Sequence, residues 1–255
     1  MNFDLLHTLE AARDAGRPVV LATVIRVSGS TPRHAGSSMV IDASSTEGTI
    51  GGGAFEFRVI DEARTLLTDM RAETRIVDVH LVRDLGMCCG GRMEVFLEKF
   101  TPKPTLWIVG VGQTGDYLAH FASQAGFQVH LVPTPQAAIP DQRLSQTTNV
   151  WPGSPTEVMS KIAESDSVII MTRDHSLDFH CVSEALDPPR SFVGMIGSRQ
   201  KRERLVDFLT AQAVEQSMIS RVRSPVGLDL AAVTPAEIAL SIVGELVRIR
   251  RGPGP

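Results

Sequence analysis

The chain has 255 residues, 43% of them hydrophobic and 21% charged, and its formal net charge is −4. These proportions are ordinary for a globular protein, and the length is sufficient for one large domain or two modest ones. The net charge gives no broad attraction to nucleic acid or to an anionic membrane. The basic runs 199–204 and 248–251 are predicted to be solvated helix surfaces. We therefore expect neither nucleic acid nor membrane as a partner.

The N-terminal segment and the cysteines indicate in which cellular compartment the protein is expected. Residues 1–16 are acidic and amphipathic, which is not the pattern of a secretory signal peptide, and no apolar run approaches the ~20 residues of a membrane span. The chain has three cysteines, and two of them are adjacent, at Cys88 and Cys89. Three cysteines form no disulfide framework, so free thiols in a reducing cytoplasm are expected.

The first hundred residues predict a mixed α+β domain. Helical spacing of apolar residues over 3–15 is followed by a β-branched run over 19–27. The remaining elements expected here are strands at 37–42, 75–81 and 92–100 and a helix at 54–67. Residues 101–105 (TPKPT) contain two prolines, which favour an extended linker. We therefore predict a first domain over 1–100 and a second over 106–255.

The second domain is predicted to be a Rossmann-like, doubly wound α/β fold. Apolar strands expected near 106–110, 128–132, 167–172 and 191–198 alternate with helices expected at 117–126, 156–163, 177–186 and 198–213. Such alternation is typical of a parallel sheet that is covered on both faces. A final helix is predicted from a capping box at Thr234–Glu237, with proline at its first position, through Arg251.

A glycine-rich turn follows the first of these strands and begins a helix. It contains Gly110, Gly112, Gln113, Thr114 and Gly115. Glycines at these positions let the backbone turn tightly and approach a phosphate, whose charge then faces the positive end of the helix. The sequence therefore predicts that this turn binds the phosphate of a cofactor.

The residue that usually binds an adenosine ribose is missing. A dinucleotide site has Asp or Glu at the end of the second strand, whereas this strand ends in Val132, Pro133 and Thr134, and the first acid is Asp141. No basic residue stands there to accept a 2′-phosphate. Ordinary use of NAD is therefore not expected, although an NAD(P)-dependent oxidoreductase that uses this turn stays open as the alternative.

Two further strand ends supply candidate residues. Gly197, Ser198 and Arg199 follow the 191–198 strand; Ser198 is a good helix N-cap, while Arg199, together with Lys201, is also a candidate for contacting an anion. The 167–172 strand is followed by Asp174 and His175, which are candidates for the edge of the cofactor site because ligands bind at the carboxyl ends of strands in such sheets.

A metal site is a less favoured alternative at the second of these strand ends. Asp174, His175, Asp178 and His180 follow one another closely, but their spacing matches no known zinc pattern. A polar loop in which Asp174 or Ser176 caps the next helix accounts for them more simply.

The first domain contains two unusual loops. Cys88 and Cys89 are followed by two glycines, which allow a ligand to approach the thiols, and thiolates are the ligands that soft metals prefer. We expect one of the two, in an extended loop, to face a site, whereas Cys181 is expected in the core. The second loop contains Gly52 and Gly53 in a run of three glycines that also suggests close approach. Glu56 and Arg33 complete the candidates, with Arg33 able to bind an anion bidentately.

Together these segments resemble the xanthine dehydrogenase accessory protein family, XdhC, which is related to the CoxI proteins. The resemblance runs in order along nearly the whole chain. Its segments are GSTPRHAGSSMVI, GTIGGGAFE, the CCGG loop, the strand with GVGQTG, MTRDHSLD, FVGMIGSRQKR and SPVGLDLAAVTPAEIALSIVGEL.

The resemblance implies a cytoplasmic, dimeric accessory protein that is not itself an enzyme. Members of this family bind the molybdenum cofactor (molybdopterin), protect its sulfurated form and deliver it to apo xanthine dehydrogenase, working with a cysteine desulfurase. The terminal phosphate of the cofactor suits the glycine turn, and its soft metal, molybdenum, suits Cys88 or Cys89 as a ligand. A third hypothesis is a thiol-redox or metal-storage module centred on the two cysteines.

Overall fold

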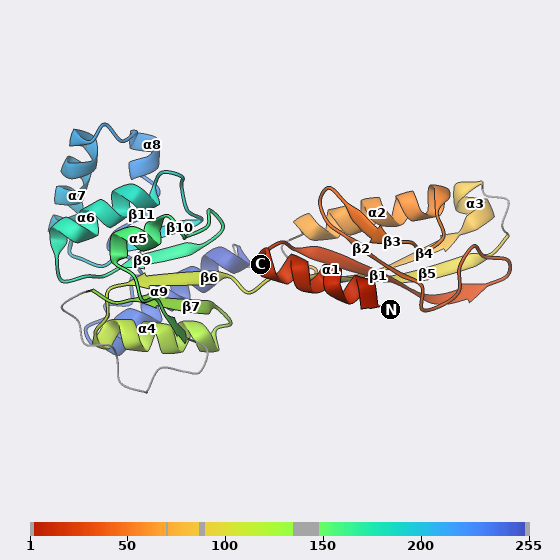
Figure 1. Cartoon of the computed structure of the whole chain (residues 1–255), viewed down its shortest axis with the longest axis horizontal. Coiled ribbons are helices and arrows are strands. Elements are labelled where there is room, and N and C mark those ends of the chain that lie inside the picture. The colour runs from red at the N-terminus through yellow and green to blue at the C-terminus, as the bar shows by residue number, and fades with distance from the viewer. Residues whose placement is uncertain (1–2, 70, 87–89, 135–147, 253–255) are drawn as a thin grey trace. The chain divides into compact units, whose positions relative to one another are not determined.

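The computed structural model describes residues 3–69, 71–86, 90–134 and 148–252. The chain divides into two compact units, residues 1–102 and 103–255 (Figure 1). Strand β6 begins at Thr105, a residue that was predicted to lie in the linker. No helix in the described ranges is both long and apolar enough to cross a membrane.

Unit 1 contains a five-stranded sheet in the order β3-β2-β1-β5-β4, and every pairing between its neighbours is antiparallel. Its strands are β1 (Val19–Ser28), β2 (Ser38–Ile41), β3 (Thr46–Gly48), β4 (Thr74–His80) and β5 (Arg92–Phe100). The long central pair, β1 with β5, runs from Val19 opposite Phe100 to Ser28 opposite Arg92. This pairing brings the segments that follow Ser28 and precede Arg92 to the same end of the sheet.

The helices of unit 1 lie on the two faces of this sheet. Alternate residues of β1 point to opposite faces, as the period of a strand requires. Val20, Ala22 and Val24 belong to the core that includes α2 (Gly53–Thr68), whereas Val19 packs in a smaller cluster with α1 (Phe3–Asp14). A short helix, α3 (Leu81–Leu85), continues from β4.

Unit 2 contains a six-stranded parallel sheet in the order β11-β10-β9-β6-β7-β8. Its strands are β6 (Thr105–Val109), β7 (Gln128–Val132), β8 (Thr148–Val150), β9 (Ser167–Ile170), β10 (Phe192–Met195) and β11 (Val222–Arg223). The first strand, β6, lies in the middle and the chain then builds outward on each side. This is the doubly wound Rossmann order, and the α/β fold class predicted from the sequence is confirmed.

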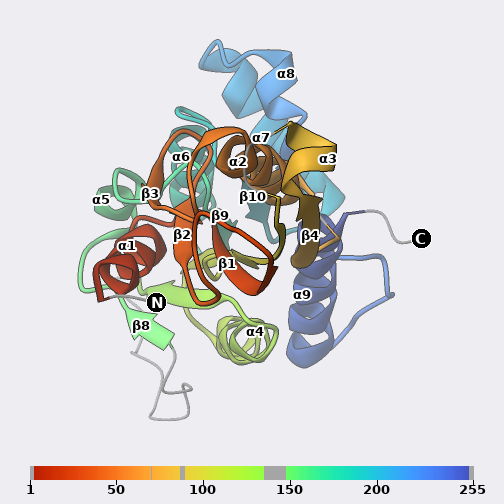
Figure 2. The same cartoon turned by 90° about the vertical axis from the view of Figure 1, so that its right-hand side faces the viewer.

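Helices cover both faces of the parallel sheet. On one face α4 (Gln113–Gln124) and α9 (Pro235–Arg251) lie side by side (Figures 1 and 2) and share a core with β6 and β7. On the other face lie α5 (Pro155–Met159), α6 (His175–Ala185), α7 (Arg199–Ala211) and α8 (Gln216–Ile219). Both α5 and α9 begin with a complete capping box and a proline, at Ser154 and Thr234 respectively.

Candidate functional site

The parallel sheet of unit 2 reverses its strand order between β6 and β9, and ligands of such sheets bind where the order reverses, at the carboxyl ends of the strands. We call this end of the sheet the carboxyl edge. The loops after β6, β9 and β10 all emerge there. They contain the glycine loop (Gly110–Gly115), the residues from Met171 to Asp174, and the residues from Ile196 to Ser198.

The three glycines of the glycine loop meet three different requirements. A Cβ at Gly110 would lie only 2.6 Å from the backbone oxygen of Met171, so a side chain would collide with the loop after β9. A Cβ at Gly115 would lie 3.4 Å from Gly110 O and from Met171 Sδ, so this glycine lets α4 pack closely. Gly112, the N-cap of α4, has a positive φ of 155° and open space where a Cβ would stand. The backbone is therefore open to a ligand at Gly112.

The charges around the glycine loop favour an anion. The start of α4 presents unpaired N–H groups and the positive end of the helix dipole. Arg173 is exposed in the loop after β9 and Arg199 at the start of α7, and within the described residues neither has an ion-pair partner. Asp116, in the first turn of α4, has a pKa raised by burial, and its buried Oδ1 has no hydrogen-bond partner in the described parts of the chain. This carboxyl therefore ionises less readily than that of an ordinary aspartate.

A buried ion pair connects the loops of the carboxyl edge. Asp178 of α6 is completely buried and accepts hydrogen bonds from the backbone N–H (2.9 Å) and the hydroxyl (2.6 Å) of Thr172. It also forms a salt bridge with Lys201 of α7, whose ammonium donates to the carbonyl of Ile196 at 3.1 Å. A Cβ at Gly197 would lie 2.5 Å from the Lys201 side chain. This pair therefore fixes the loops after β9 and β10 to each other.

The ion pair corrects one expectation, for Lys201, and bears on one less favoured alternative, the metal site. Lys201 was predicted to be solvated, or to contact an anion at the rim of the site, but its side chain is only 8% exposed and binds Asp178. Asp178 binds Lys201 and Thr172, so its carboxylate is not available to ligate a metal together with Asp174, His175 and His180. In the described ranges, no three or more acidic, histidine or cysteine side chains gather in a way that could hold a metal ion.

Two candidate residues act as helix caps. The carboxylate of Asp174 accepts from the backbone N–H groups of Ser176 (2.8 Å) and Leu177 (3.2 Å), and Ser198 Oγ accepts from the N–H of Lys201 at 3.2 Å. The predicted capping by Asp174 and Ser198 is therefore present. His175, the first residue of α6, is exposed at the same edge.

Strand β7 ends where the sequence predicted its end. The strand ends at Val132, which is buried, and half-buried Pro133 and Thr134 follow. Backbone N–H of Gly110 donates to Val132 O at 2.9 Å, so the strand end lies beside the glycine loop. Over these residues there is no carboxylate for an adenosine ribose; Asp141 lies outside the described residues.

Unit 1 brings several of its glycine-containing loops together at one end of its sheet. A Cβ at Gly91 would lie 2.5 Å from Ser30 O and 2.6 Å from Thr31 Cγ2, and one at Gly29 would lie 3.1 Å from Gly91 Cα. A Cβ at Gly51 would lie 2.7 Å from the ring of Pro32. The segments that begin at Gly29, at Gly51 and at Gly90 therefore pack against one another. Their separate positions in the sequence did not indicate these contacts.

Glu56 organises the loop before α2. Its carboxylate accepts from Thr49 Oγ1 (2.5 Å) and from the N–H groups of Ile50 (2.9 Å) and Gly52 (3.0 Å). Burial raises the pKa of this carboxyl, but these hydrogen bonds outweigh burial and lower it overall. Gly52 has a φ of 73° and open space where a Cβ would stand, whereas Gly53 begins the helix.

The cysteines divide into two groups. Cys88 and Cys89, the candidate thiols for molybdenum, lie outside the described residues. Cys181 is completely buried in α6, as predicted for a core residue, and burial raises the pKa of its thiol to about 12.

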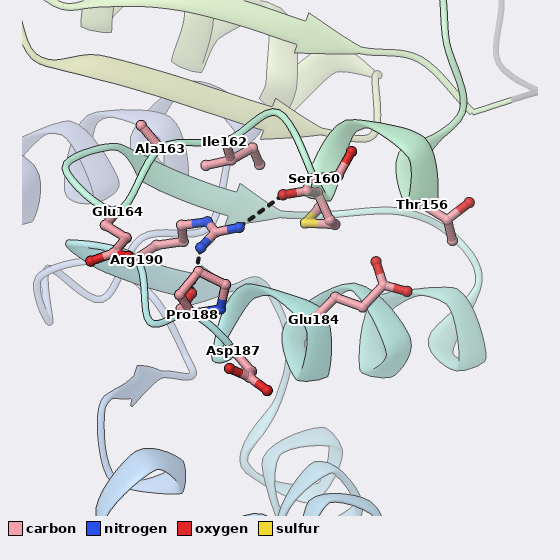
Figure 3. Close-up of a pocket in the computed structure, with 10 residues that line it drawn as sticks. Thr156, Ser160, Ile162, Ala163, Glu164, Glu184, Asp187, Pro188 and Arg190 are labelled. Carbon is pink, nitrogen blue, oxygen red and sulfur yellow. Dashed lines mark hydrogen bonds between the residues drawn. The ribbon is translucent and has the colours of Figure 1, made fainter.

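A separate pocket of about 600 Å³ lies at the opposite edge of the unit 2 sheet, formed by segments that precede β9 and β10. Figure 3 shows Arg190 extended between these segments, where its guanidinium donates to the carbonyls of Met159 (2.9 Å) and Pro188. Because this buried cation is bound by the backbone of both segments, we assign it a structural role.

Two family models match the chain. The XdhC Rossmann domain matches residues 106–246, and the XdhC and CoxI family matches residues 12–79. The chain belongs to the XdhC and CoxI family. The Rossmann match includes every candidate residue of the carboxyl edge, and the second match includes Arg33 and the loop of Gly52.

Two curated relatives are similar to this chain over part of their own length. The uncharacterized protein YqeB of Escherichia coli (strain K12) is 28% identical over 246 residues, which is 93% of this XdhC-family chain and 44% of that protein. A relative from Bacillus subtilis (strain 168), named as a probable xanthine dehydrogenase subunit, is 24% identical over 62% of this chain and 46% of its own length. The chain thus spans about half the length of the curated relatives it matches.

The solved structure shows the fold. A crystal structure from Bacillus halodurans, named as a xanthine dehydrogenase, superposes with a TM-score of 0.53. It is 21% identical and covers 97% of this chain and 95% of that one, so the likeness extends over both units.

Proposed function

We propose that this chain is an accessory protein for xanthine dehydrogenase that binds the molybdenum cofactor as cargo, protects its sulfurated form and delivers it to the apoenzyme. One observation supports the binding step above all. At the start of α4 the backbone is open at Gly112, beside a strand end without an acid, and two exposed arginines follow strands whose carboxyl ends lie at the same edge of the sheet. Family membership supports the accessory role.

The chemistry of this cargo matches the residues of the carboxyl edge. Molybdopterin ends in a phosphate, which the N–H groups at the start of α4 bind as they bind anions in other Rossmann folds. The glycine loop supplies the close approach, while Gln113 and Thr114 begin the helix that stabilises the charge. Arg199 would complete the phosphate site, since a guanidinium binds such an anion through two hydrogen bonds.

The remaining parts of the proposal concern the thiols and the partners. Cys88 or Cys89 would contact the soft molybdenum, because thiolates are its preferred protein ligands. We propose that the partners are apo xanthine dehydrogenase and the cysteine desulfurase that sulfurates the cofactor. We also propose that the chain acts in the cytoplasm as a dimer and has no turnover of its own.

A reconstitution assay tests the proposed delivery. Purified protein is incubated with molybdopterin and then with apo xanthine dehydrogenase, and the recovered activity is compared with that obtained from molybdopterin alone. The proposal predicts faster and more complete recovery with the protein present. Equal recovery with and without it would refute the delivery function.

A matched pair of glycine variants links delivery to the glycine loop. Gly112→Ala places a methyl group in the open space at the start of α4. Gly16→Ala is the control, because Gly16 also has a positive φ (65°) and open space around its Cβ position but lies at the end of α1. We expect Gly112→Ala alone to reduce recovery. Circular dichroism of both variants establishes that each is folded.

The oxidoreductase alternative has its own test. The glycines of the loop satisfy the requirements of a dinucleotide site as well, so NADH is titrated into the protein in the same buffer. Binding tighter than the millimolar range, together with hydride transfer to a substrate, would replace our proposal with the alternative. Metal binding by Cys88 and Cys89 without pterin would instead favour the thiol module.

A further inference from the structure

A pocket in unit 1 has the properties of an anion site. It has a volume of about 430 Å³, within the range of pockets that hold small molecules. It is lined by residues of α1, of the loop after β1 and of the segment around the end of β3: Leu5, Arg33, Gly36, Ser37, Ser38, Gly48 and Thr49. Among these lining residues, as far as the structure describes them, Arg33 alone is charged.

Arg33 is presented by a fixed stretch of backbone. Thr31 Oγ1 donates to the carbonyl of Arg33 at 3.0 Å, and the ring of Pro32 packs against Gly51. The aliphatic part of Arg33 lies against the same glycine, since a Cβ at Gly51 would be 3.7 Å from Arg33 Cγ. The exposed guanidinium forms no ion pair or hydrogen bond with the described parts of the chain. Its five N–H donors are therefore available to a ligand.

The other walls add donors and room, and the lining residues that the structure describes include no carboxylate. The half-buried Ser37 has a hydroxyl to which no hydrogen bond is assigned within the described ranges. Gly36 has a φ of 91° and open space at its Cβ position, so a ligand can approach the backbone there. A nearby acid, Glu56, is turned toward Thr49 and the amides of its own loop, which bind its carboxylate.

We infer that this pocket binds a tetrahedral oxyanion, with Arg33 and Ser37 as its donors. The volume exceeds what the free ion fills, so the ligand is a small molecule that ends in a phosphate or sulfate group. The inference does not rest on the proposed function, because it concerns donors in unit 1 and requires nothing of the glycine loop in unit 2.

Site-resolved NMR of the full chain tests this inference. Phenyl phosphate, inorganic phosphate and inorganic sulfate are titrated separately while the amide signals of Gly36 and Ser37 and the Nε–H signal of Arg33 are followed. We expect saturable shifts at these three residues with every probe, and tighter binding of phenyl phosphate than of the free ions. Equal affinities would mean that the site takes the free ion, which would overturn the inferred small molecule.

Variants separate a specific site from general attraction. Arg33→Ala is expected to weaken binding at these residues by about tenfold or more, as expected for the loss of a charged hydrogen bond, and Ser37→Ala by less. Arg71→Ala removes another exposed arginine of unit 1 and should leave the affinity unchanged. An equal loss for Arg33→Ala and Arg71→Ala, or shifts confined to unit 2, would overturn the inference.

Discussion

Replacing Lys201 tests the energetic role of the buried ion pair. Lys201→Met keeps the length of the side chain but removes its charge. Within the described residues, the completely buried Asp178 then retains only the hydrogen bonds from Thr172. Removing one partner of a buried pair costs about 3–5 kcal/mol. That is a large part of the free energy of unfolding of a typical domain, about 5–15 kcal/mol.

The chain provides a convenient signal for this measurement. Both of its tryptophans, Trp107 and Trp151, lie in unit 2, so tryptophan fluorescence during urea unfolding reports on the unit that contains the ion pair. Arg204→Met, an exposed position on the same helix, is the control and should change the free energy of unfolding by less than about 0.5 kcal/mol.

A double variant distinguishes the charge from the packing. Asp178→Asn combined with Lys201→Met leaves no charge at this buried pair and keeps an amide oxygen that can accept from Thr172. We expect it to recover at least about 1 kcal/mol relative to Lys201→Met alone. A cost below about 1 kcal/mol for Lys201→Met, or no recovery in the double variant, would refute the reasoning.

Four further predictions concern caps and titrating groups. Thr234→Ala removes the N-cap of α9 and should lower the free energy of unfolding by about 1 kcal/mol in the same urea assay. Cys181, buried and with a pKa raised to about 12, should react with a thiol reagent only after unfolding, as measured in a Cys88→Ser/Cys89→Ser variant. The pKa of Glu56 is lowered overall, so its stabilisation is present above the unfolded value of about 4.3 and is lost as pH falls through the lower folded value. The melting temperature of Glu56→Gln should therefore fall less on acidification than that of the wild type. The pKa of Asp116 is raised by burial, so sulfate binding at α4 should weaken as pH rises through it, and Asp116→Asn should abolish this dependence in calorimetric titrations.

The sequence predicted the features that depend on local patterns. The strand before Gly110 is a continuous apolar run, and the glycine turn that follows it begins a helix. The capping box at Thr234 is likewise a short-range signal. The strands β8 and β11 were not predicted, because two or three residues are too few to show a period.

The features that depend on the tertiary fold could not be predicted. Lys201 stands in a basic run typical of a solvated helix, and only the fold brings Asp178, 23 residues earlier, against it. Asp116 was overlooked because nothing in its neighbours indicates burial. Likewise, the contacts of Gly51 with Pro32 and of Gly91 with Ser30 follow from the pairing of β1 with β5 and from the position of α2, which local spacing does not encode.

The central claim is that a ligand with a terminal phosphate binds at the glycine loop of unit 2, and the most direct test is an NMR titration that locates the bound ligand. Amide NMR signals of Gly112, Gln113 and Thr114 are followed while molybdopterin, and separately NADH, is added to the wild-type chain and to Gly112→Ala. Our account predicts that molybdopterin shifts these three signals in the wild type, that the alanine variant loses the effect, and that NADH causes no saturable shift. Saturable shifts with NADH, or unchanged signals with molybdopterin, would contradict it.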